Sequence, residues 1–289
     1  MPGRLRFISF ITLASLCIAH LAALHAEQVL FIGNSYTSGG PDAPLARHGG
    51  IPRLVQIIAL SKARNLSFIK LTPGGKDWGY DLKQPVTDAA LRARPWDWVV
   101  LQDFSTQPTH IGNPGKFFED GETFYRLIRE SCPESKILLF ETWAREKGHV
   151  VYTGVSTPKS FIDPAQMTRE LKRSYTSLYR RLETLDTGNQ LGLAPVGSAF
   201  ALCQSKYPEI KLYWSDKHHP GVDGGYLAAL VLYASIFQDS PKGATREFFG
   251  ITLGPGVAEK LQEIAAEVTS PWEEPMPPPD GSIHNPAAK

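Results

Sequence analysis

Short apolar runs alternate along the chain with stretches whose apolar residues recur at helical spacing. The runs that we expect to form strands are residues 28–32, 67–71, 98–101, 136–140 and 191–196. The clearest helical stripe covers residues 167–185. Strands that are apolar throughout, each followed by a helix, form a parallel sheet covered on both faces, with right-handed crossovers. The sequence therefore predicts an α/β fold: a three-layer α/β/α sandwich around a central parallel five-stranded sheet.

The beginning of the chain predicts export. Arg4 and Arg6 precede an apolar stretch that continues to about Leu24, and the small residue Ala26 follows. This is the pattern of a secretory signal peptide. The alternative is a membrane anchor, since the stretch is close to the lower limit for spanning, but His20 interrupts it. We expect a signal peptide at residues 1–26, one α/β domain at 27–270 and a Pro-rich tail at 271–289. The protein would be periplasmic or secreted, with no stable membrane insertion after cleavage.

Charge and cysteine content narrow the range of partners. Lys and Arg number 30 and Asp and Glu 29, so the formal net charge is +1 and no basic footprint points to nucleic acid. Nothing in the sequence indicates the oligomeric state. Export permits disulfides, and Cys132 and Cys203 lie beyond the predicted signal peptide. Because we place them at opposite edges of the sheet, two buried thiols are favoured over one bridge.

Residues able to do chemistry follow the predicted strands. Ligands of open α/β sheets bind at the carboxyl ends of the strands, and Ser35 follows the first strand there. A serine becomes a nucleophile only with a base and with donors for the oxyanion. Asp216 and His219 can supply that base from one loop, with the carboxylate on imidazole Nδ1 and Nε2 facing the serine. The alternatives are surface residues, a helix cap at Asp216, or a metal site that adds His218. The metal site is disfavoured because adjacent histidines point in different directions.

These residues belong to motifs that resemble a known superfamily. Residues 31–36 (F-I-G-N-S-Y), the pattern Asp216-x-x-His219-Pro220 and residues 225–229 (G-Y-L-A-A) together resemble the SGNH (GDSL-type) hydrolases. The resemblance extends over nearly the whole predicted domain, and two motifs at opposite ends are more specific than one. It implies a flavodoxin-like sheet and an esterase without metal or organic cofactor. It also implies that Ser35 is the nucleophile, His219 the base and Asp216 the acid that orients it.

The resemblance further implies an oxyanion hole, from which the sequence departs at one place. In that family the donors are the serine amide, a glycine amide after the second strand and an asparagine side chain after the third. Ser35 and Gly75 match the first two, with Gly74 as the alternative to Gly75. No asparagine follows the third strand, where the chain reads L-Q-D-F-S. Gln102 carries the same amide donor on a longer stem, and Ser105 is the second choice.

Four aromatic residues lie near the predicted strand ends or beside Asp216, namely Tyr36, Trp78, Trp143 and Trp214. Aromatic faces can stack on sugar rings or simply pack in the core. As a group they favour a small-molecule or glycan ester as substrate, with an acetyl group on a carbohydrate as the preferred case. The sequence leaves open two other functions: a carbohydrate-binding protein of the same fold without turnover, and a metal-dependent hydrolase. It also leaves open whether the loops at 104–115 and 144–163 form a lid.

Overall fold

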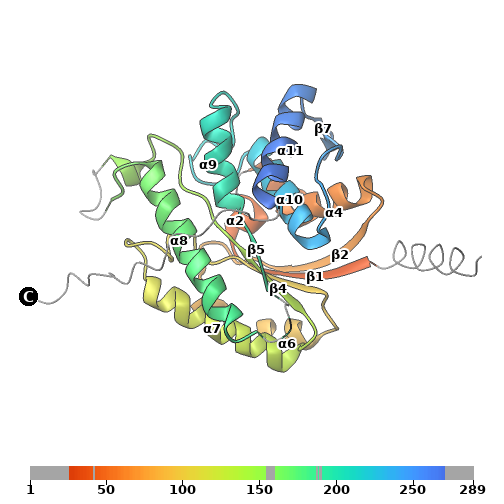
Figure 1. Cartoon of the computed structure of the whole chain (residues 1–289), viewed down its shortest axis with the longest axis vertical. Helices are drawn as coiled ribbons and strands as arrows, with labels where there is room; N and C mark the ends of the chain where they lie inside the picture. Colours follow the sequence, from red (N-terminus) through yellow and green to blue (C-terminus); the bar gives the residue numbers. More distant parts are fainter. Residues whose placement is uncertain (1–25, 42, 154–159, 187, 189–190, 271–289) are drawn as a thin grey trace, which may run out of the picture.

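A five-stranded parallel sheet forms the centre of the molecule (Figure 1). The computed structural model describes residues 26–41, 43–153, 160–186, 188 and 191–270. The sheet order is β2-β1-β3-β4-β5, which is the flavodoxin-like order. The strands are β1 (Ala26–Ile32), β2 (Asn65–Leu71), β3 (Trp98–Leu101), β4 (Lys136–Phe140) and β5 (Leu191–Ala194). The predicted fold is confirmed, whereas the predicted signal peptide and Pro-rich tail lie outside the described residues, apart from Ala26.

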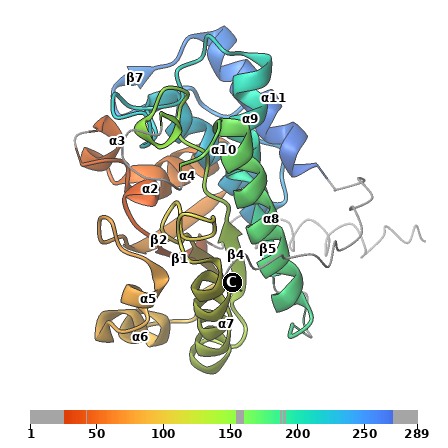
Figure 2. The same cartoon turned by 90° about the vertical axis from the view of Figure 1, so that its left-hand side faces the viewer.

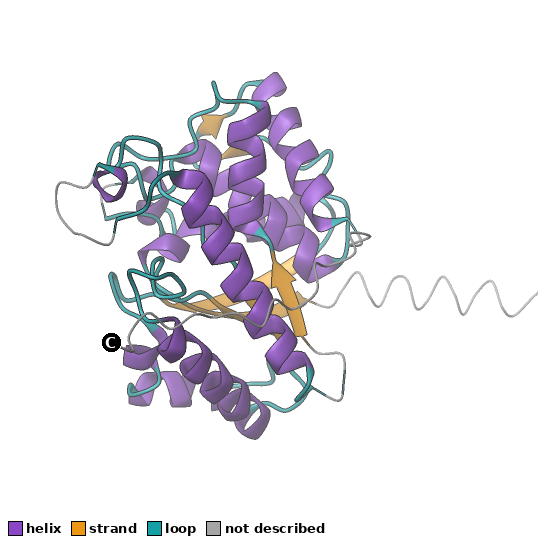
Figure 3. Ribbon diagram, turned by 60° about the vertical axis from the view of Figure 1, so that its left-hand side comes forward, coloured by secondary structure: helices purple, strands orange, loops and turns teal. Residues whose placement is uncertain are grey.

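Helices cover both faces of this sheet (Figure 3). Successive strand residues point to opposite faces, so Val29 and Phe31 pack into one core and Leu30 and Ile32 into the other. The first core is closed by α4 (Gly50–Ser61), α9 (Val196–Lys206), α10 (Val222–Phe237) and α11 (Pro255–Thr269). The second is closed by α6 (Pro85–Arg92), α7 (Pro114–Ser131) and α8 (Pro164–Glu183). These two cores give the three layers.

Several elements differ from the sequence expectation. The segment between β2 and β3 forms two helices, α5 (Trp78–Asp81) and α6, because Pro85 has no N–H to continue a helix and instead begins a new one. The last strand is shorter than expected, since Val196 already belongs to α9, a helix that we did not predict. A short hairpin of β6 (Glu247–Phe248) and β7 (Ile251–Thr252) precedes α11.

Two short helices follow β1 at the carboxyl edge of the sheet, α2 (Ser35–Ser38) and α3 (Pro44–Arg47). Figure 2 shows both on the side of the sheet that also carries α4 and α10. The loop after β4 contains the 3₁₀ turn η1 (Val150–Tyr152).

Cys132 and Cys203 are buried free thiols, as expected. Across the part of the chain that the structure describes, no helix is both long and apolar enough to cross a bilayer.

Candidate active site

Asn34 organises the turn at which the chain leaves β1. Its side-chain oxygen accepts a hydrogen bond from the Tyr36 amide at 3.0 Å and thereby caps α2. Its side-chain nitrogen donates to the Lys76 carbonyl at 2.8 Å, in the loop after β2. This bond ties the half-buried Ser35 to the loop that carries Gly75. Gly75 is exposed and has φ +69°, a backbone conformation that glycine adopts without strain. The two loops that we expected to form the oxyanion hole therefore adjoin.

Gln102 is bonded to the residues of this turn. Its side-chain oxygen accepts from the Asn34 amide at 3.1 Å and from the Thr37 hydroxyl at 2.8 Å. Its amide nitrogen donates to the Asn34 side-chain oxygen at 3.1 Å and to the Asp103 carbonyl.

The expected role of Gln102 as an oxyanion donor is thereby corrected. A side-chain amide has two N–H donors, and both are used within the turn. The residue is only 1% exposed, and the extra methylene relative to asparagine lets the amide reach back under α2. Gln102 supports the loop that carries Ser35.

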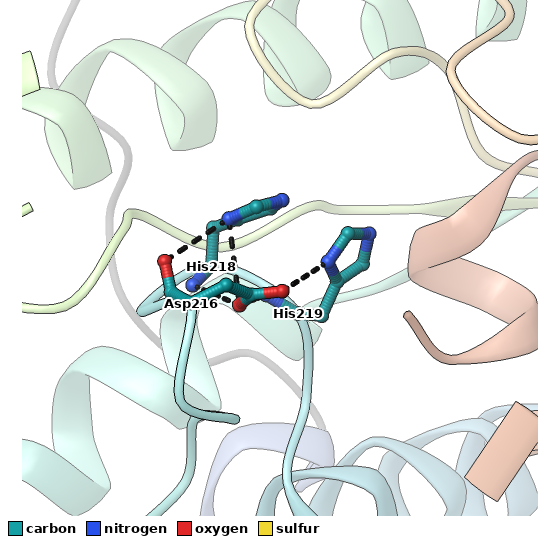
Figure 4. A group of neighbouring side chains, drawn as sticks. All are labelled: Asp216, His218 and His219. Carbon is teal, nitrogen blue, oxygen red and sulfur yellow. Dashed lines mark hydrogen bonds and ion pairs between the residues drawn. The ribbon is translucent and has the colours of Figure 1, made fainter. Parts of the chain in front are cut away.

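Asp216 and His219 form the hydrogen-bonded pair expected from their spacing (Figure 4). The distance from Asp216 Oδ2 to His219 Nδ1 is 2.7 Å. The other carboxylate oxygen accepts from the backbone amides of His218 at 3.0 Å and His219 at 2.9 Å. Lys217 has φ +63° at the tight turn between them. Burial acts to raise the pKa of Asp216, but these hydrogen bonds outweigh it and the pKa falls to about 2. The carboxylate is therefore ionised at neutral pH.

His219 packs against the segment that begins with Ser35. The residue is 7% exposed, and its ring lies 5.7 Å from the ring of Tyr36, which directly follows Ser35. A Cβ on Gly40 would lie 2.7 Å from His219 Cγ, so the backbone after α2 touches the imidazole. Nε2 is buried and has no hydrogen-bond partner among the described residues. The imidazole thus has one nitrogen fixed by a carboxylate and one without a partner, on the side away from Asp216 (Figure 4).

Asp216, His218 and His219 also form a group with ligand atoms within 4.8 Å of one another, which raises the question of a metal. Two ligands of one tetrahedral zinc lie about 3.3 Å or more apart, because each metal–ligand bond is about 2.0–2.2 Å. The 2.7 Å separation of Asp216 Oδ2 and His219 Nδ1 is shorter than this and is a direct hydrogen bond. The arrangement fits a carboxylate–imidazole pair and does not fit a chelate.

The aromatic residues expected to stack on a sugar are mostly enclosed. Trp78 is fully buried and stacks on Phe117, with ring centroids 5.3 Å apart. Trp143 is fully buried between Tyr36 at 4.5 Å and Phe200 at 4.4 Å. Because Tyr36, Trp78 and Trp143 have their faces covered by protein, the expectation that they stack on substrate is wrong. Among the four, Trp214 alone is half-buried and keeps part of its surface accessible. Trp143 instead fixes the loop that carries Asp216 and His219, since its Nε1 donates to the His218 carbonyl at 3.0 Å.

Two residues of the site were missed by the sequence analysis. Asn34 had a signal that could have found it, because asparagine directly before a short helix is typical of a cap. Arg145 had none. It lies five residues beyond the end of β4, and its guanidinium donates to the Tyr36 hydroxyl and to the Ser105 hydroxyl at 3.3 Å each. Ser105, the second choice for an oxyanion donor, is itself buried beside this guanidinium.

Comparison with known proteins tests the fold. No family model matches the sequence, and no curated protein matches it either. The structure is similar to that of a DUF4886 family protein from Bacteroides uniformis, with a TM-score of 0.65 and 14% identity over 84% of this chain and 95% of that chain. It is also similar to a family 3 carbohydrate esterase of Clostridium thermocellum, with a TM-score of 0.53 and 10% identity over 74% and 96% of the two chains. The esterase EstA from a Pseudoalteromonas species gives a TM-score of 0.51 and 15% identity over 73% and 97%.

The chain shares its three-layer fold with these esterases. At these identities the similarity concerns the fold alone, and it confirms the fold that the sequence motifs implied. The parallel sheet places the loops after β1, β2, β3 and β4 at one edge, where Ser35, Gly75, Gln102 and Arg145 are found.

Proposed function

We propose that this chain is an exported serine esterase that hydrolyses O-acyl esters, acetyl esters above all. The observation that carries the proposal is the His219 imidazole, whose Nδ1 is held by Asp216 at 2.7 Å and whose buried Nε2 has no partner among the described residues. Leaving a buried polar nitrogen without a hydrogen bond lowers the stability of the folded protein, so the unpaired Nε2 of His219 points to a functional role. Proton transfer with the Ser35 hydroxyl is the role that this geometry supports, because Ser35 begins the helix packed against the imidazole.

The reaction follows from these groups. Ser35 Oγ attacks the ester carbonyl while His219 Nε2 takes the serine proton. Asp216 keeps Nδ1 protonated and stabilises the imidazolium that forms. His219 then protonates the leaving alcohol, and in the second step it activates water to release the acid from Ser35. The free imidazole and the free serine are regenerated, so no cofactor enters the cycle.

The oxyanion is held by the amides of Ser35 and Gly75 in this proposal. Support comes from the Asn34–Lys76 bond, which joins the loops that carry the two amides. Gln102 acts indirectly by fixing Asn34 and Thr37. Fixed donors matter because each one removed from an oxyanion hole typically costs about 10²–10³ in rate.

A carbohydrate alcohol is the finer part of the proposal. It is supported by the half-buried Trp214, which lies two residues before Asp216, and by the fold that the chain shares with a carbohydrate esterase. Residues 216–219 are called the catalytic loop below. Trp78 and Trp143 no longer support it, because both are enclosed. A lipid ester is the competing substrate class, and comparable turnover of long-chain esters would count against the carbohydrate.

The test is acetate release from acetylated glycans and from a small aryl acetate by the purified protein. We expect Ser35→Ala to abolish release from both substrates while the melting temperature stays within a few degrees. Ser38→Ala, at the other end of the same short helix, is the matched control and keeps wild-type activity. Wild-type turnover in Ser35→Ala would refute the mechanism. A wild-type protein that binds acetylated glycans without releasing acetate would instead favour the non-catalytic carbohydrate-binding alternative.

A further inference from the structure

Arg145 carries a buried guanidinium group that has no carboxylate partner among the residues that the structure describes. The residue is 9% exposed, and its two hydrogen bonds go to neutral hydroxyls, those of Tyr36 and Ser105, at a long 3.3 Å each. Its buried Nε has no hydrogen-bond partner within the described ranges, and no ion pair of Arg145 is found there. An arginine has five N–H donors and does not lose its proton in proteins. Burying such a cation unpaired is costly, so the position calls for a bound anion.

The nearby carboxylates are engaged elsewhere. Glu141, in the same loop, bonds to the Ser198 hydroxyl, and burial raises its pKa to about 7. Asp216 is saturated by His219 and by two backbone amides. Glu146 follows Arg145 in sequence but forms no ion pair with it in the part of the chain that the structure describes. The described residues therefore supply no counter-ion to the Arg145 guanidinium.

The histidines around Arg145 add no compensating charge. Burial, helped by the guanidinium, lowers the pKa of His149 to about 4. Burial also lowers the pKa of His218, with His219 and Arg145 acting in the same direction. Both histidines are consequently neutral at neutral pH, and Arg145 remains the buried cation beside the catalytic loop.

Arg145 is also close to the reacting groups. Its Nη1 donates to the hydroxyl of Tyr36, the residue that directly follows Ser35, and the Tyr36 ring lies 5.7 Å from that of His219. The guanidinium thus stands about one tyrosine side chain away from the imidazole. An acidic group bound at the guanidinium would therefore lie beside the residue that directly follows Ser35.

We propose that Arg145 binds a carboxylate of the substrate, so that the preferred substrates are acylated acidic sugars. This inference rests on the proposed esterase function and specifies its substrate class. The planar guanidinium fork matches a carboxylate with two parallel hydrogen bonds. The hydroxyls of Tyr36 and Ser105, which flank the fork, can donate to the same anion. Anion binding would give the guanidinium an opposite charge, which its two long bonds to neutral hydroxyls do not provide.

The test uses a matched pair of substrates, a mono-O-acetylated methyl glucuronoside and the corresponding methyl glucoside. The first carries a carboxylate where the second carries a hydroxymethyl group. We expect the wild-type kcat/KM to be about 10–100-fold higher for the acidic substrate, as charged hydrogen bonds typically give. Arg145→Gln should reduce this ratio to near one, mainly by raising KM for the acidic substrate. Arg145→Lys should keep part of the preference. Lys147→Gln removes an exposed cation two residues from Arg145 and should leave the ratio unchanged.

Two kinetic outcomes would overturn the inference. One is a wild-type enzyme that hydrolyses both substrates equally well, which leaves the esterase proposal intact. The other is an Arg145→Gln variant whose kcat falls equally on both substrates, since this is the signature of an oxyanion donor or of a structural role. If the protein turns over neither substrate and a fluorophosphonate does not label Ser35, the esterase proposal itself is refuted.

Direct binding provides a second readout that is independent of turnover. In the Ser35→Ala background, calorimetry should detect binding of the acetylated glucuronoside and much weaker binding of the glucoside. Adding Arg145→Gln should remove the difference between the two ligands. Equal binding of both ligands by Ser35→Ala itself would contradict the assignment of Arg145.

Discussion

The hydrogen bond between Asp216 and His219 fixes which nitrogen of the imidazole can act as a base. With Asp216 Oδ2 at 2.7 Å from Nδ1, the proton resides on Nδ1 and Nε2 is left to accept. Because the pKa of Asp216 falls to about 2, this carboxylate is charged at neutral pH. Asp216 therefore positions the His219 imidazole, and its effect is on kcat.

We expect Asp216→Asn to lower kcat by about 10³–10⁴, because an amide N–H facing Nδ1 forces the wrong tautomer. KM should change little, since Asp216 does not contact the ester in the mechanism. Steady-state kinetics on an aryl acetate measures both parameters. Asp223→Asn, a nearby half-buried acid in the first turn of α10, is the control and should keep kcat within a few-fold. A full-strength kcat in Asp216→Asn would show that the pair is not the catalytic base.

Gln102 makes a separate prediction at the same scale. Gln102→Met keeps the length of the side chain but removes its bonds to Asn34 and Thr37, leaving buried polar groups unpaired. We expect the free energy of unfolding to fall by about 2–4 kcal/mol, together with activity. Urea unfolding measures the free energy of unfolding, and acetate release measures the activity. Gln107→Met, in the following loop, is the control and should change both quantities little. An activity loss at unchanged stability would restore Gln102 as an oxyanion donor.

At the scale of elements, the site depends on how closely α2 and the catalytic loop pack. Gly40 follows α2, and a Cβ there would lie within 2.7–2.9 Å of three His219 side-chain atoms. Such distances force the imidazole to move, because a buried ring cannot bend away as the end of a flexible side chain can. The absence of a side chain at residue 40 is thus a requirement of the catalytic geometry.

We expect Gly40→Ala to lower kcat by about tenfold to a hundredfold, since small displacements of a catalytic group have effects of this size. The melting temperature should fall by only a few degrees. Gly256→Ala in α11 is the matched control, because its Cβ would meet nothing within 4 Å. If Gly40→Ala keeps full activity, His219 does not work from the position seen here.

The elements also show what sequence can and cannot predict. The strands at 98–101 and 136–140 were predicted to the residue, because their apolar side chains all have to be buried in a two-sided sheet. Helix α9 was missed because the predicted strand was extended through Pro195 to Val196, whereas β5 ends at Ala194 and α9 begins at Val196. The Asp216–His219 pair was predictable, since both residues lie in one short loop. The roles of Gln102, Trp78 and Arg145 were not, because they depend on contacts between residues far apart in the sequence.

At the scale of the whole molecule, buried carboxyl groups couple stability to pH. Burial raises the pKa of Asp103 to about 8, although the amides of Trp78 and Phe104 bond to it at 2.8 Å and 2.7 Å. Burial likewise raises the pKa of Glu141 to about 7. At these two carboxyl groups the folded state therefore binds more protons than the unfolded state between about pH 4 and pH 8. Stability is greatest at the acidic end of this window and is lost as the pH rises through the folded pKa values.

We expect the free energy of unfolding to decrease from pH 5 to pH 8, with a slope of at most about 1.4 kcal/mol per pH unit for each such group. Asp103→Asn keeps an acceptor for the two amides but removes one titration, so its stability should fall less steeply with pH. Urea unfolding of the two proteins at pH 5 and pH 8 gives the comparison. Parallel pH profiles would mean that Asp103 is already ionised in the folded protein at pH 5.

The central claim is that Ser35 is activated by His219, and labelling with a fluorophosphonate followed by peptide mapping tests it most directly. Only an activated serine displaces the fluoride, and the adduct stays on its oxygen. The account predicts a single adduct on Ser35 in the wild-type protein, full labelling in Ser38→Ala, and loss of labelling in His219→Gln. No adduct on Ser35, or one that forms equally fast in His219→Gln, would contradict it.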